Sequence, residues 1–463
     1  MAQVKEKPKP VLVPEYCKGC GRCVSVCVKG CIAFSDEINP LTGLVPVVLD
    51  LAKCNGCGLC IEACPEPYGL RAMENGEQYE LQDPARLFGE RRHDAPEPVD
   101  IPARLVPLPR TEPLVIKGNY AAAIGAILAG CRHVYGYPIT PSTEGAELMA
   151  KLQPKLGGIF LQAVSEVATV NHMYGTAGAG LPTMTFTSSP GFSLMLEGVS
   201  YMVGAELPAV FINVMRGGPG LGNIAPEQAD IKLACHGLGH GNTHAISLVP
   251  STPQEMLDLT MLAFELSFKY RNPVVVLADG YLGQMTGKVV LPGHLVEPGI
   301  PAWAVYGDLN HRRNLITSID LLELDLEAHN VHLNSKYEAM QAEARADCYH
   351  TDDAEVVLVA CNTPARTAKG AVQALREAGL KVGLFRPITI WPFPIQHLLP
   401  ILPHTKHLVV VEASAGQVAD ELRLNASRAG VTQLPHLTSV RRMGGVLPQQ
   451  AEVVEHVMAL GAR

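Results

Sequence analysis

The sequence CKGCGRCVSVC at residues 17–27 and the sequence CNGCGLCIEAC at residues 54–64 decide the fold of the first part of this chain. Both stretches have the cysteine spacing C-x2-C-x2-C-x3-C. Nine of the thirteen cysteines lie between residues 17 and 64, and the other four are scattered through the rest of the 463 residues. Such crowding in a long chain that opens without a secretion signal favours metal binding over disulfide bonds.

This spacing is that of bacterial ferredoxins with two iron–sulfur clusters, in which three thiolates on one loop hold three corners of a cubane and the other motif supplies the fourth ligand. We therefore predict two [4Fe-4S] clusters in a small α+β ferredoxin domain. The first cluster is expected to be held by Cys17, Cys20, Cys23 and Cys64. The second is expected to be held by Cys54, Cys57, Cys60 and Cys27. The alternatives are a pair of zinc sites or a disulfide knot, but zinc ribbons use two C-x2-C pairs and not triplets.

Two positions depart from the ferredoxin pattern. Val28 stands where a proline usually follows the fourth cysteine, and Cys31 is an additional thiol. Because the eight ligand positions are already filled, we expect Cys31 to be a small buried residue and not a ligand. The same small, apolar behaviour is expected of the four scattered cysteines, which are Cys131, Cys235, Cys348 and Cys361.

Charge and hydropathy limit the classes of partner. The net charge is −8 and no block of Lys and Arg recurs, which argues against nucleic acid and an anionic membrane surface as partners. The opening stretch MAQVKEKPKP has no apolar segment, and no later stretch approaches the roughly 20 uninterrupted apolar residues of a membrane span. The sequence therefore predicts a cytoplasmic protein that binds proteins and small molecules.

The pattern along the chain predicts five segments. Residues 84–113 are rich in proline and charge and lack periodicity, so they are expected to be an extended linker. Beyond them, continuous apolar runs such as Thr183–Thr187 and Val274–Leu277 alternate with helical patterns, which indicates a buried parallel sheet and an α/β fold. The expected order is a ferredoxin domain at 1–83, the linker at 84–113, an α/β domain at 114–300, a connector with some helix at 301–350 and a second α/β domain at 351–463.

Individual elements can be predicted within both α/β domains. The first domain is expected to open with a small-residue helix at Asn119–Gly130, which suits close packing. The second is expected to contain strands at Glu355–Ala360, Lys381–Phe385 and His407–Val411, with a helix at Pro364–Ala378.

Polar residues that follow apolar runs are candidates for function, because ligand sites in open α/β sheets form beyond the carboxyl ends of strands. The loop YPITPST, residues 137–143, presents hydroxyls before a helix, and it either binds an anion or supplies an N-cap through Ser142 or Thr143. Glu166 starts an Ala-rich helix and is either a dipole partner or a buried hydrogen-bonding group. Arg216 enters a glycine-rich loop and suits either a planar carboxylate or a structural ion pair.

Six stretches, taken in order, resemble one known family. They are YPITPSTE (137–144), SEVATVNHMYGTAGAG (165–180), TFTSSPGFSLMLEG (185–198), VMRGGPGLG (214–222), DGYLGQM (279–285) and FRPITIWPFP (385–394). They are similar to the alpha subunit of 2-oxoacid:ferredoxin oxidoreductases of the 2-oxoisovalerate or 2-oxoglutarate type, with a delta-type ferredoxin fused ahead of it. The resemblance implies that the first α/β domain is the pyrimidine-binding domain of a thiamine diphosphate enzyme and that the second is similar to the C-terminal domain of transketolase.

The resemblance also implies roles for five residues. Glu166 would hydrogen-bond the aminopyrimidine ring of thiamine diphosphate, and Pro138 and Ile139 would contact the same cofactor. Thr140 and Arg216 would receive the carboxylate of a 2-oxoacid. The acid would be decarboxylated to carbon dioxide and an acyl-coenzyme A, while electrons pass through the clusters to ferredoxin. Physical chemistry agrees, because a carboxylate on the ring nitrogen activates this cofactor and an arginine binds a carboxylate through paired hydrogen bonds.

Part of such an active site is missing from the sequence. A complete thiamine enzyme also needs a GDG motif and a downstream Asn for magnesium, whereas the stretch GDLNH at residues 307–311 lacks the second glycine. We expect that stretch to be a polar turn. The resemblance therefore implies a beta subunit that holds the diphosphate, Mg2+ and a further cluster, a gamma subunit, and an active site at a subunit interface.

The substrate and the role each have alternatives. The stretch GGPGLGNIAPEQAD, residues 217–230, has Gly220 and Leu221 where many relatives have Ser-Thr, and it is similar to members that act on branched-chain 2-oxoacids such as 2-oxoisovalerate. 2-Oxoglutarate and aromatic 2-oxoacids are the alternative substrates. The alternative role is a non-catalytic electron-transfer and scaffold subunit, which would have no need of Glu166 and Arg216 in cofactor and substrate positions.

Three histidines, His236, His240 and His244, have a spacing of four residues that could indicate a metal site. The glycines between them work against a regular helix, so we expect them to line the core or a pocket. Trp391 is expected to be a packing residue.

Overall fold

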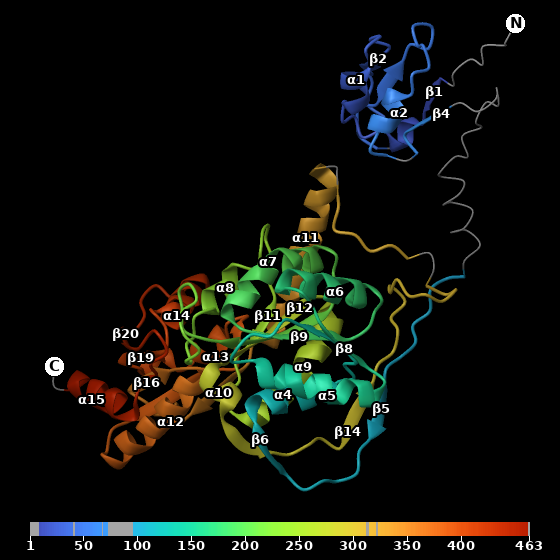
Figure 1. The fold of residues 1–463 in the computed structure, drawn as a ribbon. Coiled ribbons are helices and arrows are strands. Elements are labelled where there is room, and N and C mark those ends of the chain that lie inside the picture. Colours follow the sequence, from blue (N-terminus) through green and yellow to red (C-terminus); the bar gives the residue numbers. More distant parts are fainter. Residues whose placement is uncertain are drawn as a thin grey trace, which may run out of the picture. The chain divides into compact units, whose positions relative to one another are not determined.

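The computed structural model describes residues 9–39, 42–66, 68–72, 96–311, 314–320 and 323–461. The chain divides into two compact units, residues 1–95 and 96–463; Figure 1 shows the first in blue and the second in cyan to red. Residues 73–83 of the expected ferredoxin domain and residues 84–95 of the expected linker lie outside the described residues.

The described part of the small unit contains two antiparallel ribbons and one short helix in each cysteine motif. Its elements are β1 (Pro10–Leu12), which pairs with β4 (Leu70–Ala72), β2 (Ile32–Phe34), which pairs with β3 (Val47–Leu49), the 3-10 turn η1 (Pro14–Tyr16) and the helices α1 (Arg22–Val26) and α2 (Leu59–Ala63). Each helix follows a glycine with left-handed backbone angles, Gly21 at φ 72° and Gly58 at φ 83°. Glycine adopts this conformation without the steric cost of a side chain. The expected α+β domain is confirmed.

The large unit contains a seven-stranded sheet in the order β18-β11-β12-β10-β9-β7-β8. Its strands are β7 (His133–Gly136), β8 (Ile159–Gln162), β9 (Thr183–Thr187), β10 (Ala209–Met215), β11 (Ile246–Leu248), β12 (Pro273–Asp279) and β18 (Thr389–Trp391). Neighbouring strands are parallel except for β18, which is antiparallel to β11. Every residue of β10 and β12 is buried, so these strands are continuous apolar runs in the sequence and not alternating ones.

Helices cover both faces of this sheet. Figure 1 shows α4 (Gly118–Leu128), α5 (Thr143–Leu152) and α9 (Pro253–Tyr270) on one side, and α6 (Glu166–Gly178) and α7 (Ser189–Gly204) on the other. The small residues of α4 allow it to pack closely on α9, because a Cβ on Gly125 would lie only 2.6 Å from the carbonyl oxygen of Leu257. The expected α/β fold is confirmed.

A second sheet has five strands in the order β15-β17-β16-β19-β20. Its strands are β15 (Ala346–Tyr349), β16 (Val356–Val359), β17 (Val382–Pro387), β19 (His407–Glu412) and β20 (His436–Arg441), and the helices of this part are α12 (Asn362–Glu377), α13 (Ile395–Leu398), α14 (Gln417–Arg428) and α15 (Gln450–Leu460). All pairs are parallel except β15 with β17. β18 follows β17 directly in the chain but pairs with β11 in the seven-stranded sheet. The segment from β17 to β18 therefore connects the two sheets.

The linker expected at residues 84–113 needs correction in its described part. Residues from Pro96 onward belong to the large unit, where β5 (Arg104–Pro107) pairs with β14 (His294–Glu297). All four residues of β5 are exposed. The strand is therefore held by main-chain pairing, and it has no alternating apolar pattern that a sequence analysis could detect.

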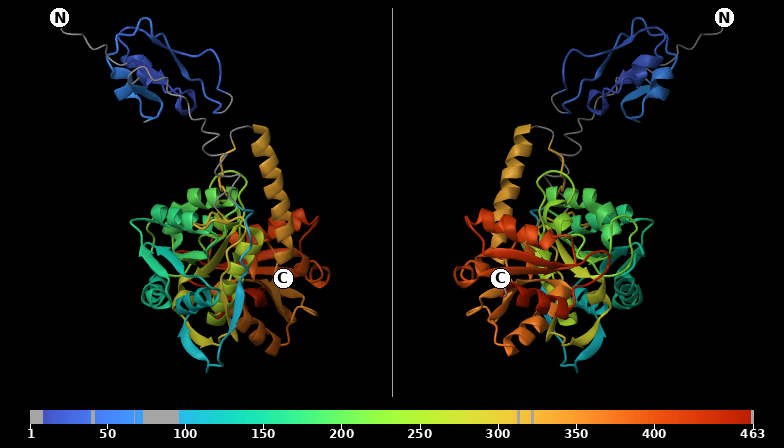
Figure 2. Two further views of the ribbon diagram at one scale, coloured as in Figure 1. Left: turned by 90° about the vertical axis from the view of Figure 1, so that its right-hand side faces the viewer. Right: turned by 90° about the vertical axis from the view of Figure 1, so that its left-hand side faces the viewer.

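The connector expected at residues 301–350 contains one long helix, α11 (Glu323–Met340). Its second half packs on the large unit through Leu333, Tyr337 and Met340, and Figure 2 shows this helix in orange. The remaining short elements are β6 (Leu114–Lys117), β13 (Thr286–Val289), α8 (Ile231–His236), α10 (Gly280–Gln284), η2 (Gln153–Leu156), η3 (Gln341–Glu343) and η4 (Leu402–His404). None of the helices within the described ranges has both the length and the apolar character needed to cross a membrane.

Candidate functional site

The cysteines of the small unit line two cavities. One cavity is lined by Cys17, Cys20, Cys23 and Cys64. The other is lined by Cys27, Cys54, Cys57 and Cys60, together with Cys31. In each set the last cysteine of one motif joins the first three of the other, which is the interleaving expected from the spacing. All nine are free thiols, so they fit an iron–sulfur centre, which needs thiolate ligands.

Main-chain N–H groups point at two of these sulfur atoms. The Gly56 N–H donates to Sγ of Cys54, and the Cys31 N–H donates to Sγ of Cys27, each at a distance of 3.4 Å. Such donors stabilise the negative charge of a metal-bound thiolate and tune the potential of a cluster.

The loop between β7 and α5 leaves the hydroxyl of Thr140 available. Thr140 and Pro138 are exposed and Ile139 is half-buried. Ser142, which precedes α5, does not cap the helix; its hydroxyl donates to the Ile139 carbonyl at 2.8 Å. The N-capping alternative is therefore wrong for Ser142. Among the described residues, the Thr140 hydroxyl has no hydrogen-bond partner.

Glu166 is the first residue of α6, and its side chain is only 6% exposed. Ser165 caps the helix by accepting a hydrogen bond from the Ala168 N–H at 3.2 Å, so Glu166 is not needed for that purpose. Within the described ranges, the Glu166 carboxylate has no hydrogen-bond or ion-pair partner. A buried carboxylate without a partner is costly, and this one fits a ring nitrogen that needs a carboxylate.

Arg216 follows β10, and its guanidinium connects two loops. Nη1 donates to the main-chain carbonyl of Thr140 at 2.9 Å, and Nη2 donates to the carbonyl of Leu221 at 3.2 Å. Its Nε–H is buried and has no acceptor in the described part of the chain. The alternative of a structural ion pair is not realised there, because both acceptors of the guanidinium are carbonyl groups.

The start of α7 brings Glu166 and Arg216 into one site. A Cβ on Gly191 would lie 2.5 Å from Oε1 of Glu166, so the glycine makes room for that carboxylate. Two residues earlier, the hydroxyl of Ser189 accepts a hydrogen bond from the Arg216 N–H at 3.1 Å. Together with the contact between Arg216 and Thr140, these neighbours unite the three residues that the sequence predicted on three separate loops.

The sequence analysis missed two buried acids, Glu227, which holds the glycine-rich loop at residues 217–222, and Asp230, which contacts β10. Oε2 of Glu227 accepts a hydrogen bond from the Gly218 N–H at 3.0 Å, and Oδ2 of Asp230 accepts one from Nδ2 of Asn213 at 2.8 Å. Burial raises the pKa of Asp230. Their sequence signal is weak, because EQAD also looks like the polar start of a helix.

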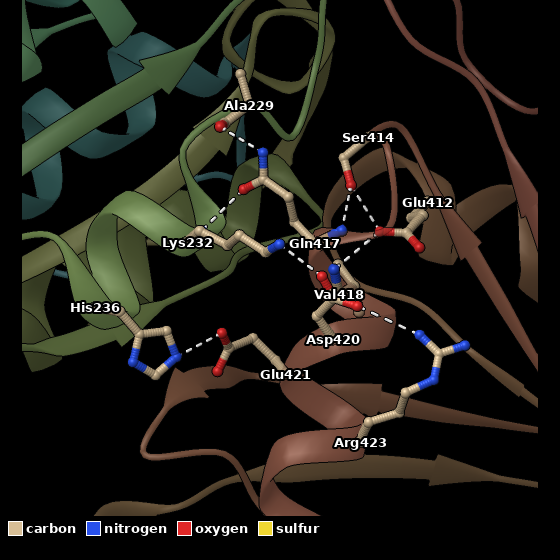
Figure 3. Close-up of polar contacts among 10 residues, drawn as sticks. All are labelled: Ala229, Lys232, His236, Glu412, Ser414, Gln417, Val418, Asp420, Glu421 and Arg423. Atoms are coloured by element: carbon tan, nitrogen blue, oxygen red, sulfur yellow. Dashed lines mark hydrogen bonds and ion pairs between the residues drawn. The ribbon is translucent and has the colours of Figure 1, made fainter.

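Helix α8 follows this loop and is fixed to the second α/β domain. Figure 3 shows Lys232 and His236 of α8 facing Asp420 and Glu421 of α14. Nζ of Lys232 lies 2.6 Å from Asp420, and Nε2 of His236 lies 2.7 Å from Glu421. The Lys232 N–H also donates to the side chain of Gln417 at 2.9 Å. Burial raises the pKa of Glu421, whereas its partner His236 is exposed.

The expectation that the three histidines line the core or a pocket is wrong for His236 and His240, which are exposed. It holds for His244, which lines a cavity together with Trp391. His236 pairs with Glu421, whereas the ring of His240 lies edge-on to Tyr201. The ring of His244 stacks on Trp391, with centroids 4.8 Å apart. Within the described residues, no cluster of histidine, cysteine and acidic side chains in the large unit is arranged to hold a metal ion.

The stretch at residues 307–311 is a polar turn, as expected. Oδ1 of Asp308 accepts hydrogen bonds from the His311 N–H at 2.9 Å and from the His311 ring at 2.7 Å. The Asp308 side chain is therefore occupied within its own turn.

Three family models match this chain and together cover most of it. The thiamine-diphosphate-binding model of pyruvate flavodoxin/ferredoxin oxidoreductases matches residues 124–360. The model of pyruvate:ferredoxin oxidoreductase core domain II matches residues 354–453, and the 4Fe-4S dicluster model matches residues 7–68.

Individual relatives agree with these matches. Ketoisovalerate oxidoreductase subunit VorB of Methanothermobacter marburgensis is 46% identical over 346 residues, which are 74% of this chain and 96% of the relative. 2-Oxoglutarate synthase subunit KorA of Methanocaldococcus jannaschii is 35% identical over 372 residues, 74% of this chain and 98% of the relative. A solved 2-oxoglutarate:ferredoxin oxidoreductase from Magnetococcus marinus superposes with a TM-score of 0.67 at 26% identity, over 75% of this chain and 65% of the other. The chain therefore belongs to the 2-oxoacid:ferredoxin oxidoreductase family, as a subunit that joins a thiamine-diphosphate-binding domain to a [4Fe-4S] domain.

Proposed function

We propose that this subunit supplies the aminopyrimidine-binding and carboxylate-binding half of the thiamine diphosphate site, and the electron outlet of the enzyme. In the reaction, a 2-oxoacid, coenzyme A and two oxidised ferredoxins give an acyl-coenzyme A, carbon dioxide, a proton and two reduced ferredoxins. The observation that carries the proposal is the buried carboxylate of Glu166, which has no partner among the described residues. Leaving such a group buried is destabilising unless a ligand completes it.

Glu166 is proposed to bind the ring nitrogen of the aminopyrimidine and to hold a proton there. Thiamine diphosphate supplies a carbon nucleophile and an electron sink for decarboxylation. The hydrogen bond from Glu166 would be strong, because the residue is only 6% exposed and charges interact more strongly in a low dielectric. Pro138 and Ile139, on the neighbouring loop, are proposed to contact the same ring by packing.

Arg216 and Thr140 are proposed to receive the carboxylate of the substrate. The two carbonyl groups that accept from Nη1 and Nη2 fix the plane of the guanidinium, while its buried Nε–H still needs an acceptor. A carboxylate oxygen supplies that acceptor in a charge-assisted hydrogen bond. The free hydroxyl of Thr140 is a second donor. The negative charge that Arg216 binds leaves with carbon dioxide, so the product is held less tightly than the substrate.

Two [4Fe-4S] clusters are proposed for the small unit. Each cavity is lined by the four assigned cysteines that one cubane needs, one of the cavities also by Cys31, and the family model is that of a dicluster domain. The clusters would carry electrons one at a time from the active site to an external ferredoxin.

Several partner subunits are proposed. The diphosphate and Mg2+ need a further domain, because the GDLNH turn uses its Asp308 internally. A beta subunit with a cluster of its own would provide that domain, and a gamma subunit would complete the complex. The active site would then lie where the beta subunit meets the loops of Thr140, Glu166 and Arg216.

A branched-chain 2-oxoacid is the proposed substrate. Leu221 accepts the second hydrogen bond of the Arg216 guanidinium, and its own side chain is 85% exposed. Ile224, in the same loop, is 61% exposed. Exposed apolar side chains beside the carboxylate site favour an apolar substrate tail and give no partner to a second carboxylate. The 46% identical relative is named for ketoisovalerate.

A substrate panel tests the proposal and separates it from the scaffold alternative. The complex is assayed for coenzyme A-dependent reduction of ferredoxin with 2-oxoisovalerate, pyruvate, 2-oxoglutarate and an aromatic 2-oxoacid. We expect the highest kcat/KM for 2-oxoisovalerate. A preference for 2-oxoglutarate would overturn the substrate class alone. Full activity of a complex in which Glu166 and Arg216 are both replaced by alanine would support the scaffold role.

A further inference from the structure

Cys31 lies in the same cavity as the four cysteines assigned to the second cluster. That cavity is lined by Cys31 in addition to Cys27, Cys54, Cys57 and Cys60. The other cavity is lined by four cysteines, Cys17, Cys20, Cys23 and Cys64. One cluster site therefore has five sulfur atoms around it and the other has four.

The turn after the first motif brings Cys31 back to Cys27. Gly30 has left-handed angles, with φ 57°, and its N–H donates to the Cys27 carbonyl at 3.0 Å. The Cys31 carbonyl then accepts a hydrogen bond from the Asp50 N–H at 2.8 Å, which fixes the end of the turn. As a result, Sγ of Cys31 lies 3.5 Å from Sγ of Cys27.

The side chain of Cys31 is held at the cavity and shielded from solvent. Only 6% of the residue is exposed. Its N–H and its thiol both contact Sγ of Cys27, at 3.4 and 3.5 Å. Both cysteines line this cavity, and because χ1 of a cysteine has three staggered positions, rotation about one bond changes where its sulfur lies.

We propose that Cys31 is a reserve ligand, a thiol that can replace Cys27 on the cluster held by Cys54, Cys57 and Cys60. This inference rests on the proposed two-cluster assignment. In the resting site the Cys31 thiol donates its S–H to the Cys27 thiolate, which is bound to iron. If the Cys27 thiolate left the iron, it would take up the proton of the Cys31 thiol, 3.5 Å away, and Cys31 would bind that iron as a thiolate in its place. No electron is transferred in the exchange.

The matched test compares the remote fourth ligands of the two clusters. Cys27 has a thiol four residues further along, at Cys31, whereas Cys64 has Tyr68 at the same distance. The variants are C27A, the double variant C27A/C31A, and C64A as the control without a reserve thiol. Iron and sulfide are measured in the full-length chain prepared alone and without oxygen, so that no cluster of a partner subunit is counted, and the reduced clusters are examined by electron paramagnetic resonance.

Since each cubane contains four irons, we expect about eight iron atoms per chain in the wild type and in C27A, and about four in C27A/C31A and in C64A. The signal of the unaltered cluster serves as the reference for correct folding. About four iron atoms in the wild type would overturn the two-cluster assignment. About eight iron atoms in the wild type, with equal losses of iron in C27A and C27A/C31A, would overturn only the proposed role of Cys31.

A second variant tests the contact without removing a ligand. C31A should keep about eight iron atoms per chain, because four thiolates remain for each cubane. It should lower the reduction potential of one cluster and leave the other unchanged, since a hydrogen bond to a ligand sulfur stabilises the reduced, more negative cluster. Two unchanged potentials would contradict the contact on which the proposal depends.

Discussion

Nη1 of Arg216 donates a hydrogen bond to the main-chain carbonyl of Thr140 at 2.9 Å, although the two residues are 76 positions apart in the chain. Nη2 donates to the Leu221 carbonyl at 3.2 Å. The guanidinium thus connects the loop after β7 to the glycine-rich loop after β10. The proposed carboxylate receptor is therefore held in place before any substrate binds, which lowers the entropic cost of binding.

The variant R216K keeps the charge of this position and removes the planar fork. Lysine cannot contact both carbonyl groups and a carboxylate at the same time. Loss of one hydrogen bond to a charged group costs about 1.5–3 kcal/mol, which corresponds to a fall of about 10- to 100-fold in kcat/KM for the 2-oxoacid. Steady-state kinetics of the complex measure this effect. R366K, at an exposed position of α12, is the control, and equal kinetics of the two variants would contradict the assigned role.

The variant G191A tests the space around Glu166. A Cβ there would lie 2.5 Å from Oε1 of Glu166 and 2.5 Å from Oγ1 of Thr187, so one of these groups must move. We expect weaker retention of thiamine diphosphate with unchanged iron content, measured on the purified complex. G175A is the matched control, because a Cβ at that helical glycine meets nothing within 4 Å and alanine favours a helix by about 1 kcal/mol. Unchanged cofactor retention in G191A would show that Glu166 does not face the cofactor.

The variant L221S tests the proposed substrate class. Its side chain is 85% exposed, so folding should be little affected. One apolar contact discriminates by about 1–3 kcal/mol, and kcat/KM for 2-oxoisovalerate should fall about tenfold or more relative to 2-oxoglutarate. I319S, at a connector residue that is 69% exposed, should leave the ratio unchanged. If the ratio of kcat/KM for 2-oxoisovalerate to kcat/KM for 2-oxoglutarate is the same in both variants, Leu221 does not contact the substrate tail.

His244 should make the stability of the large unit depend on pH. Burial against Trp391 lowers the pKa of His244 from its ordinary value of 6.5, and the charges of His236 and Arg428 act in the same direction. Folding therefore favours the neutral ring. The resulting stability is present above pH 6.5 and is lost as the pH falls through the lower pKa of the folded state. Urea unfolding followed by tryptophan fluorescence between pH 7.5 and about 5 measures it.

The variant H244F removes this titration and keeps an aromatic ring beside Trp391. Its free energy of unfolding should fall less with decreasing pH than that of the wild type. H240F, at an exposed position, should follow the wild type. A pH dependence in H244F as steep as that of the wild type would assign the effect to another group.

The elements that could be predicted with bounds from the sequence are those for which burial leaves a strong pattern. β9 lies at Thr183–Thr187, and α4 and α12 begin within two residues of their predicted starts. β5 was missed since all of its residues are exposed, and main-chain pairing and the ion pair of Arg104 with Glu297 hold it on β14. The antiparallel pairing of β18 with β11 could not be predicted either, because it joins residues more than 130 positions apart by backbone contacts.

The sequence predicted which residues form the candidate site more readily than it predicted the contacts between them. The two cysteine sets follow from ligand spacing. In two-cluster ferredoxins the first three cysteines of one motif bind one cubane, and the other motif supplies its fourth ligand. The contact of Arg216 with Thr140, the room that Gly191 leaves for Glu166, and the support of the loop by Glu227 each depend on loops that meet only in the folded chain. The position of Cys31 against Cys27 likewise required the structure of the turn at Gly30.

Glu166 is proposed to act on thiamine diphosphate within an enzyme whose other half lies in a partner. The most direct measurement is 2-oxoacid-dependent reduction of ferredoxin by the complex with E166Q, alongside E147Q at an exposed position of α5. We predict that E166Q loses about 10²- to 10⁴-fold in turnover, as expected for removal of a proton-holding group, while its iron content and that of E147Q stay at the wild-type level. Turnover of E166Q equal to that of E147Q would contradict the account.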